Sequence, residues 1–205
     1  MVFNRGGMLL NGRYIAVLLF MLLAVNSADA SSHGMEGYSS AGCTCHGPAP
    51  GIDANVSVEG IPDEYEAGET YTLTIRLTGG PDAHSSGHHG GFNLAASDGE
   101  FTPVDSSTYI TENGEITHEH SGANQRIWAV EWTAPLQEGD ITFTIAGNIV
   151  DGDHEPSDGD DWALASYVSK GGDMTISQML DYYSPMIIVI LLFAVSFLMI
   201  RSSRN

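Results

Sequence analysis

Two thiols and an imidazole lie close together near the start of the chain, at Cys43, Cys45 and His46. These are the only two cysteines among 205 residues. The segment Cys-Thr-Cys-His is one residue shorter than Cys-x-x-Cys-His, the motif that attaches haem c. Thiolates and imidazoles are also ligands that copper and zinc accept. We therefore predict a cofactor site here, occupied by haem c or by copper or zinc.

The spacing of this motif leaves three interpretations open. Removing one residue from a helical turn moves the first sulfur by about 100°, so the haem geometry would have to be rebuilt. In an extended segment, Cys43 and Cys45 would face the same side and present two thiolates to Cu(I) or Zn(II), with His46 adjacent. A disulfide between them would need a strained turn. Haem, another metal, and a disulfide or reactive thiols without a cofactor all remain candidates.

A second candidate site consists of five of the eight histidines in the chain. The set is His84, His88, His89, His118 and His120. The first three lie in a loop rich in glycine and serine, and the last two are spaced to point to one face of a strand. Imidazoles are the ligands that Cu(II) prefers, and short histidine-rich tracts are a modest metal signal. We predict a metal site if the two segments meet in space.

A third candidate is an acidic segment with the carboxylates Asp151, Asp153, Asp158 and Asp160. These are enough carboxylates for Ca²⁺, but the spacing and the closing glutamate of an EF-hand are missing. A solvated acidic loop is therefore the favoured interpretation. No Ser-His-Asp set or carboxylate pair can be picked out, which favours binding or electron transfer over catalysis.

Both ends of the chain have targeting or membrane character. Residues 1–30 combine Arg5 and Arg13 with an apolar run and a small-x-small site, and we predict a cleaved signal peptide. Residues 182–200 are almost entirely apolar and match the length of a membrane span. Arg201 and Arg204 follow the span and predict a cytoplasmic tail at 201–205. We therefore expect a single-pass type I protein of the cell membrane, with its main domain outside.

The charge of the chain is strongly one-sided, with 26 acidic residues against 7 basic ones and a formal net charge of −19. Such a surface repels phosphate, so nucleic acid is excluded as a partner. It suits a solvated domain in salty surroundings. The membrane is the one partner that the sequence identifies, and a redox partner or an extracellular ligand is a further candidate of unknown identity.

Between the two ends, short runs alternate apolar and polar residues, which is the pattern of half-buried strands. Clear examples begin at Val56, Tyr71, Phe92, Trp128 and Ile141, and a last one runs from Trp162 to Val168. The pair Asn113-Gly114 predicts a hairpin turn. Seven or eight short strands without a convincing helix predict an all-β, antiparallel β-sandwich. We expect it to bury Trp128, Trp132 and Trp162 between its two sheets.

The order of several short motifs resembles a known family. They are Gly91-Phe92-Asn93-Leu94, Thr117-His118-Glu119-His120-Ser121, Trp132-Thr133-Ala134-Pro135 and Gly147-Asn148-Ile149-Val150-Asp151-Gly152-Asp153. This order is similar to the reelin-type (Reeler) domain and to its prokaryotic relatives, the choice-of-anchor V surface proteins. The resemblance implies an immunoglobulin-like sandwich on the cell surface. It also implies a Cys-x-x-Cys-His motif soon after the signal peptide, where this chain has Cys43-Thr44-Cys45-His46.

The predicted layout is a signal peptide at 1–30, a leader at 31–53 that carries the cysteines, and a Reeler-like sandwich at 54–170. A stalk at 171–181 and the membrane helix follow. The functional hypothesis is a membrane-anchored surface protein that binds metal or haem, for electron transfer or metal handling. The alternative is a non-catalytic module for adhesion or matrix binding.

Overall fold

The computed structural model describes residues 33–82, 87–137, 139–153, 159–172 and 176–202. Three predictions lie wholly outside these residues: the signal peptide at 1–30, His84 as a metal ligand, and Asp158 as a calcium ligand. The predicted cytoplasmic tail is described only at its first two positions, which are helical.

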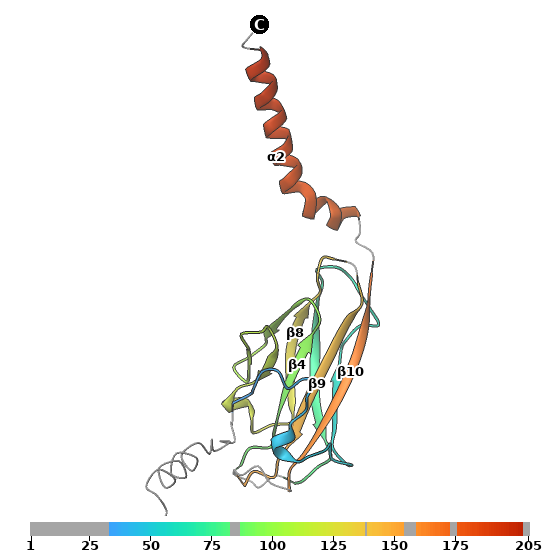
Figure 1. Cartoon of the computed structure of the whole chain (residues 1–205), viewed down its shortest axis with the longest axis vertical. Helices are drawn as coiled ribbons and strands as arrows, with labels where there is room; N and C mark the ends of the chain where they lie inside the picture. Colours follow the sequence, from blue (N-terminus) through green and yellow to red (C-terminus); the bar gives the residue numbers. More distant parts are fainter. Residues whose placement is uncertain (1–32, 83–86, 138, 154–158, 173–175, 203–205) are drawn as a thin grey trace, which may run out of the picture. The chain divides into compact units, whose positions relative to one another are not determined.

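Ten strands in the described residues form two sheets that pack face to face (Figure 1). The four-stranded sheet has the order β1 (Asn55–Glu59), β3 (Thr70–Thr78), β8 (Ile127–Thr133) and β5 (Glu100–Pro103). The six-stranded sheet has the order β2 (Glu64–Tyr65), β10 (Asp161–Gly171), β9 (Ile141–Ile149), β4 (Gly90–Ala96), β7 (Ile116–His118) and β6 (Thr108–Ile110). Two short 3-10 helices, η1 (Thr44–His46) and η2 (His120–Gly122), and the helix α2 (Ile176–Ser202) complete the fold. The predicted all-β sandwich with a C-terminal apolar helix is confirmed.

The core lies between the sheets, where the alternating pattern predicted it. Trp128, Val130 and Trp132 of β8 are buried on one face. Trp132 packs edge-on against Phe143 of β9, with ring centroids 4.9 Å apart. Each such side chain contributes about 1.5–3 kcal/mol through the apolar surface that it removes from water. The residues that alternate with them face outward, so the register of each strand is fixed by its buried face.

The hairpin predicted at Asn113-Gly114 is present, because β6 and β7 pair on either side of it. Two strands were not predicted. β2 is too short to show a period, and β5 carries one inward apolar residue, Phe101, before Pro103 ends it.

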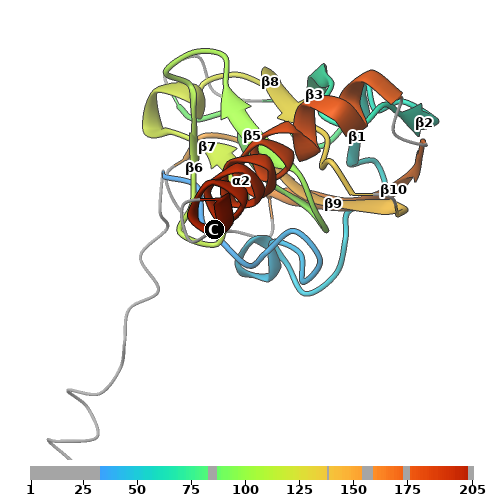
Figure 2. The ribbon, with the colours of Figure 1, turned by 90° about the horizontal axis from the view of Figure 1, so that it is seen from above.

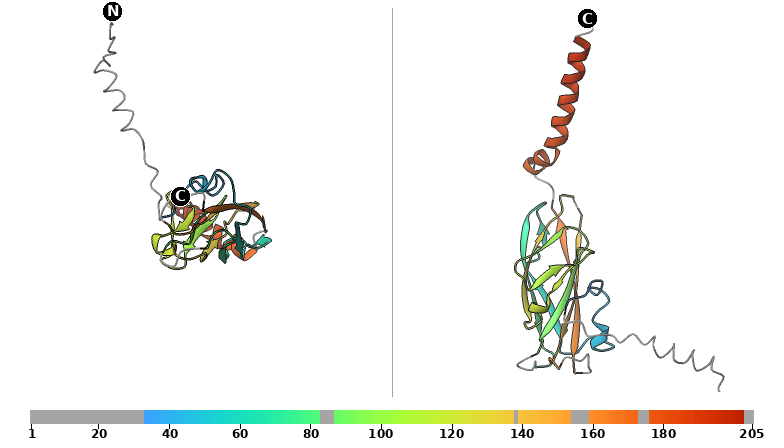
Figure 3. Two further views of the ribbon diagram at one scale, coloured as in Figure 1. Left: turned by 90° about the horizontal axis from the view of Figure 1, so that it is seen from below. Right: turned by 90° about the vertical axis from the view of Figure 1, so that its left-hand side faces the viewer.

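Strand β4 departs from the half-buried pattern, since every residue from Gly90 to Leu94 is buried. The reason is that the leader lies against the outer face of the six-stranded sheet (Figures 2 and 3). Trp162 of β10 is only 4% exposed, but it lies on this outer face under the leader. The prediction that Trp162 is buried between the two sheets is therefore wrong, whereas Trp128 and Trp132 are where they were expected.

By length and composition, helix α2 can cross a membrane from Ile176 to Met199. It begins inside the segment 171–181 that was predicted as a stalk. Pro185 lies within the helix and cannot donate a hydrogen bond to the carbonyl of Asp181. The Ser184 hydroxyl donates to that carbonyl instead, at 3.0 Å.

Candidate functional site

A series of hydrogen bonds fixes the leader to the outer face of the six-stranded sheet. The Gly34 amide donates to the His118 carbonyl at 2.9 Å, and the Tyr109 hydroxyl donates to the Gly34 carbonyl at 2.6 Å. The Tyr38 amide donates to Asn93 Oδ1 at 2.9 Å. These contacts span β6, β7 and β4, so the leader is held along its length. This docking was not predicted from the sequence.

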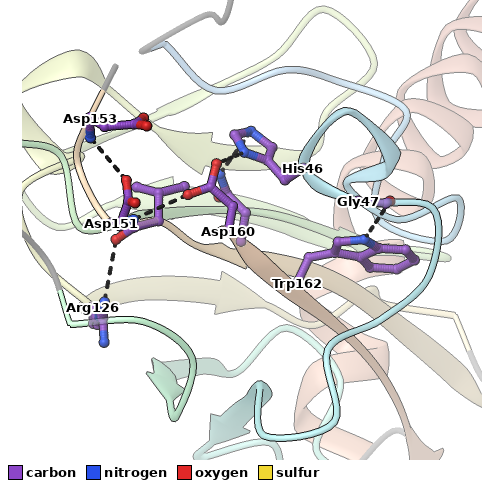
Figure 4. Close-up of polar contacts among 9 residues, drawn as sticks. His46, Gly47, Arg126, Asp151, Asp153, Asp160 and Trp162 are labelled. Carbon is purple, nitrogen blue, oxygen red and sulfur yellow. Dashed lines mark hydrogen bonds and ion pairs between the residues drawn. The ribbon is translucent and has the colours of Figure 1, made fainter. Parts of the chain in front are cut away.

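His46 meets a buried carboxylate from the other end of the chain. His46 Nδ1 lies 2.7 Å from Asp160 Oδ2, and the Asp160 side chain is only 1% exposed (Figure 4). On the opposite edge of the ring, Asn148 Nδ2 lies 3.3 Å from His46 Nε2. Strand β9 supplies Asn148, and Asp160 directly precedes β10. The sheet therefore orients the imidazole from both sides.

These two contacts select one tautomer of His46. The Asp160 carboxylate accepts, so Nδ1 carries the proton and donates it. The Asn148 amide donates to Nε2, which must then hold a lone pair. A histidine whose Nδ1–H is bonded to a carboxylate while Nε2 keeps its lone pair has the arrangement seen in metal-ligating histidines.

Hydrogen bonds within the acidic segment that includes Asp151, Asp153 and Asp160 hold the Asp160 side chain in place. Asp160 Oδ1 accepts the Asp151 amide at 3.1 Å, and Asp151 Oδ1 accepts the Asp153 amide at 3.0 Å (Figure 4). Both carboxylates thus already bind the backbone of the loop. This places three of the predicted calcium ligands and gives Asp160 a role in orienting His46 that was not predicted.

The cysteines flank the first residue of η1, which spans Thr44 to His46. Cys43 is the residue directly before this short helix, so the motif is a tight turn. The alternative of an extended segment is therefore wrong. The two thiols are free and differ in exposure, since Cys43 is half-buried and Cys45 is exposed. Burial raises the pKa of Cys43 to about 12, and the neighbouring Cys45 adds to the shift. Cys43 is therefore a thiol, not a thiolate, at neutral pH.

Trp162 forms the floor beneath this turn. Its indole Nε1 donates to the Gly47 carbonyl at 3.0 Å, and its carbonyl accepts the Gly51 amide at 2.9 Å. A Cβ on Gly42 would lie 2.1 Å from the Trp162 ring, so only glycine lets the leader approach this closely. The Cys43 to His46 turn is held between Gly42 and Gly47, directly over the tryptophan.

The predicted histidine site is only partly assembled. β7 ends at His118, and His120 begins η2, so the expectation that both point to one face of a strand is wrong. His118 is buried, with Nδ1 3.2 Å from the Phe92 amide, and desolvation lowers its pKa to about 4. Its ring occupies the space that a Cβ on Gly91 would need.

A different group of histidines does come together. The His88 and His120 rings lie edge to face with centroids 5.0 Å apart, and His33 of the leader stacks on His120 at 5.5 Å. His89 is not in these ring contacts, and its carbonyl accepts a hydrogen bond from Arg126 Nε at 3.0 Å. The sequence pattern missed His33 because nothing in the spacing of a lone leader histidine relates it to the loops.

Among the described residues, no group of three or more His, Cys, Asp or Glu side chains is already arranged to hold a metal ion. The structure thus places each described candidate residue without testing its predicted role as a ligand. Asp160, Asn148 and His33 are the additions that the three-dimensional arrangement makes.

No protein-family model matches the chain, and no curated protein is significantly similar to it. Among solved structures, it is similar to the reeler domain of human F-spondin, with 20% identity over 59% of this chain and 93% of that one and a TM-score of 0.38. It is also similar to a conjugative transposon lipoprotein of Bacteroides eggerthii, with 13% identity over 58% of this chain and 98% of that one and a TM-score of 0.33. At identities and TM-scores this low, structural similarity carries no information about function. The solved structures that resemble this chain nevertheless include Reeler domains, the family that the order of its motifs resembles.

Proposed function

We propose that this chain is a membrane-anchored surface protein that binds a metal ion at Cys43, Cys45 and His46, for metal handling or electron transfer. The observation that carries the proposal is the short contact between His46 Nδ1 and the buried Asp160 carboxylate. Burying the Asp160 carboxylate costs desolvation free energy, and the contact with His46 offsets part of that cost. A buried pair of this kind contributes little net stability, which points to a role for it beyond folding.

The orientation of His46 suits a ligand. Its Nε2 holds the lone pair and, within the described part of the chain, meets the Asn148 amide at 3.3 Å. An approaching ion would displace this one long hydrogen bond. The carboxylate behind the ring keeps the imidazole from rotating and so fixes the direction of Nε2.

The cysteines set the kind of ion and the conditions for binding it. Thiols and an imidazole within one turn favour a soft or borderline ion such as Cu(I) or Zn(II). Cys43 must lose its proton to bind, and burial raises its pKa to about 12. Binding therefore releases protons, and the affinity rises with pH.

Haem remains a proposal that these residues satisfy less well than an ion. A macrocycle joined to both sulfurs and to His46 must reach one half-buried and one exposed cysteine while displacing Asn148 from Nε2. A single ion must meet the same three side chains, but it is far smaller than a macrocycle and forms no covalent bond to carbon with the sulfurs. If haem were bound, Cys43, Cys45 and His46 would hold it, and it would supply an iron centre for one-electron transfer.

The anchor is the feature that supports a place at the membrane. By length and composition, α2 can cross a bilayer from Ile176 to Met199, and the basic residues Arg201 and Arg204 come after this span in the sequence. With the positive end in the cytoplasm, the sandwich and its leader lie outside the cell. The strongly acidic composition supports an exposed, well-solvated domain.

The test is the metal content and optical spectrum of the full-length chain purified in detergent. We expect a stoichiometric soft metal that is lost in a Cys43→Ser/Cys45→Ser variant and reduced in His46→Ala, with His89→Ala as the matched histidine control. A Soret band would instead identify haem. A colourless, metal-free chain whose folding is unaffected by these changes would overturn the proposal and leave adhesion as the function.

A further inference from the structure

We propose that Asn55 is a site of N-linked glycosylation, which takes its sugar from a lipid-phosphate carrier on the outer side of the membrane. Asn55-Val56-Ser57 is the one Asn-x-Ser/Thr sequence in the chain, and its middle residue is not proline. The inference rests on the proposed placement of the sandwich outside the cell. It involves neither the cysteines nor a metal ion.

The structure places the two groups that this modification needs on one side of strand β1. Val56 and Val58 point into the core and are 3% and 6% exposed. Successive side chains of a strand face opposite sides, so Asn55 and Ser57 both point away from the core. The acceptor amide and the hydroxyl two residues later therefore lie on the same outer surface, where a transferring enzyme can recognise them together.

Neither of these two side chains is engaged elsewhere. Asn55 is exposed, and within the described residues neither its amide nor the Ser57 hydroxyl forms a hydrogen bond. The Asn93 and Asn148 side chains, in contrast, are hydrogen-bonded to the leader. A sugar on Asn55 therefore breaks no contact of the fold.

The other exposed asparagines of the sandwich lack the hydroxyl. Asn113 is followed two residues later by Glu115, and Asn124 by Arg126. Exposure alone therefore does not single out Asn55. The combination of exposure, a free amide and a hydroxyl on the same face does.

The surroundings of Asn55 leave room for a sugar. β1 lies at the edge of the four-stranded sheet, where β3 is its one hydrogen-bonded neighbour among the described strands. Thr78 is opposite Asn55 on β3 and is small and exposed. Ile52 and Asp53, just before the strand, are exposed as well. A glycan here would also shield part of an edge that could otherwise pair with another chain.

The reaction forms one bond and breaks one. Asn55 Nδ2 attacks the anomeric carbon of the sugar, and the amide gives one proton to a base of the transferring enzyme. The bond between that carbon and the oxygen of the carrier phosphate breaks, and the phosphate leaves with the electron pair. No oxidant or reductant is needed, and the carrier lies in the membrane to which α2 is proposed to anchor the chain.

The experiment is mass spectrometry of the full-length chain, isolated from the membranes of the cells that naturally produce it. A protease that cuts after acidic residues releases residues 54–59, which contain Asn55 and Ser57. We expect this peptide to carry the mass of one or more sugars. The added mass should be lost completely in Asn55→Gln and in Ser57→Ala. It should remain in Ser57→Thr, which keeps a hydroxyl at this position, and in Asn113→Gln, which alters another exposed asparagine.

An unmodified mass for residues 54–59 of the wild type would overturn the proposal, and so would a sugar that persists in a folded Ser57→Ala chain. Adding protease to intact cells separates this failure from a failure of the proposed placement. Cleavage of the sandwich in intact cells, together with an unmodified peptide, would overturn glycosylation alone. Protection of the sandwich, together with an unmodified peptide, would overturn the placement outside the cell as well.

Discussion

Burial keeps two titratable side chains near the leader uncharged. His118 stays a neutral imidazole because desolvation lowers its pKa from 6.5 to about 4. Cys43 stays a thiol because burial raises its pKa from 9.0 to about 12. Both pKa shifts arise because the leader and the sheet exclude water from these side chains. One shift predicts a pH dependence of stability and the other a difference in thiol reactivity, and both can be measured without a cofactor.

The shift of His118 predicts a pH dependence of stability. The unfolded chain binds the His118 proton at a higher pH than the folded chain, so the stabilising effect is complete above pH 6.5 and is lost as the pH falls toward 4. The loss is at most about 3 kcal/mol. The free energy of unfolding, measured with a chelator present, should therefore fall more steeply between these pH values for the wild type than for His118→Gln. Equal slopes would show that His118 is not buried as a neutral ring.

The two cysteines are predicted to react at different rates. Cys45 is exposed, whereas Cys43 is half-buried and remains protonated at pH 8. Because the thiolate is the reactive form, iodoacetamide should modify Cys45 at least tenfold faster than Cys43 in the folded chain. Mass spectrometry of the peptides reports both rates, and the two should converge in denaturant. Equal rates in the folded chain would contradict the burial of Cys43.

The sequence showed which residue types could do chemistry but not their partners. Cys43, Cys45 and His46 are adjacent, so their spacing is visible directly. Asp160 is 114 positions away from His46 and belongs to an acid-rich segment in which no single carboxylate stands out. Asp160 becomes the partner of His46 only because the leader docks on the sheet, which the sequence does not show.

At the scale of the elements, the strands were predictable wherever one face meets the core and the other meets water. β3 and β8 alternate cleanly for this reason. An alternating pattern shows that one face of a strand is buried, but not whether that face meets the core or is covered by another segment. For this reason Trp162 was assigned to the wrong side of β10. The leader has no periodicity, so its own contacts could not be predicted.

The docking of the leader depends on the absence of a side chain at Gly42. Its φ of +83° and the Trp162 ring 2.1 Å from a Cβ position make Gly42→Ala both strained and obstructed. Gly37→Ala is the matched control, because its φ is +80° but nothing lies within 4 Å. The strain alone costs about 1–2 kcal/mol.

We expect Gly42→Ala to separate the leader from the sheet near Trp162. Exposure of Trp162 to water should then shift the tryptophan emission to the red, and proteolysis between residues 33 and 51 should become faster. Gly37→Ala should keep the wild-type emission, since Trp162 stays covered. Identical emission and cleavage for the two variants would mean that the leader does not rest on Trp162.

At the scale of the whole molecule, the proposed role of α2 as a membrane anchor can be tested directly. Ile188→Arg/Leu191→Arg places two charges in the middle of α2, at about 3 kcal/mol each. The variant should shift from the carbonate-resistant membrane fraction to the soluble fraction, whereas Ser202→Arg, at the end of the helix, should remain in the membrane. Retention of the double variant in the membrane would contradict the assignment of α2 as the anchor.

The central claim is that Asp160 orients His46 to bind a metal ion together with the cysteines. Its most direct test is the Cu(I) affinity of the full-length chain, measured by competition with a chelator, for Asp160→Asn and for Asp161→Asn. Both variants lose one negative charge at neighbouring positions, but only Asp160 contacts His46. We predict an affinity about 10- to 100-fold weaker for Asp160→Asn and an unchanged affinity for Asp161→Asn. Equal affinities for Asp160→Asn and the wild type would contradict the claim.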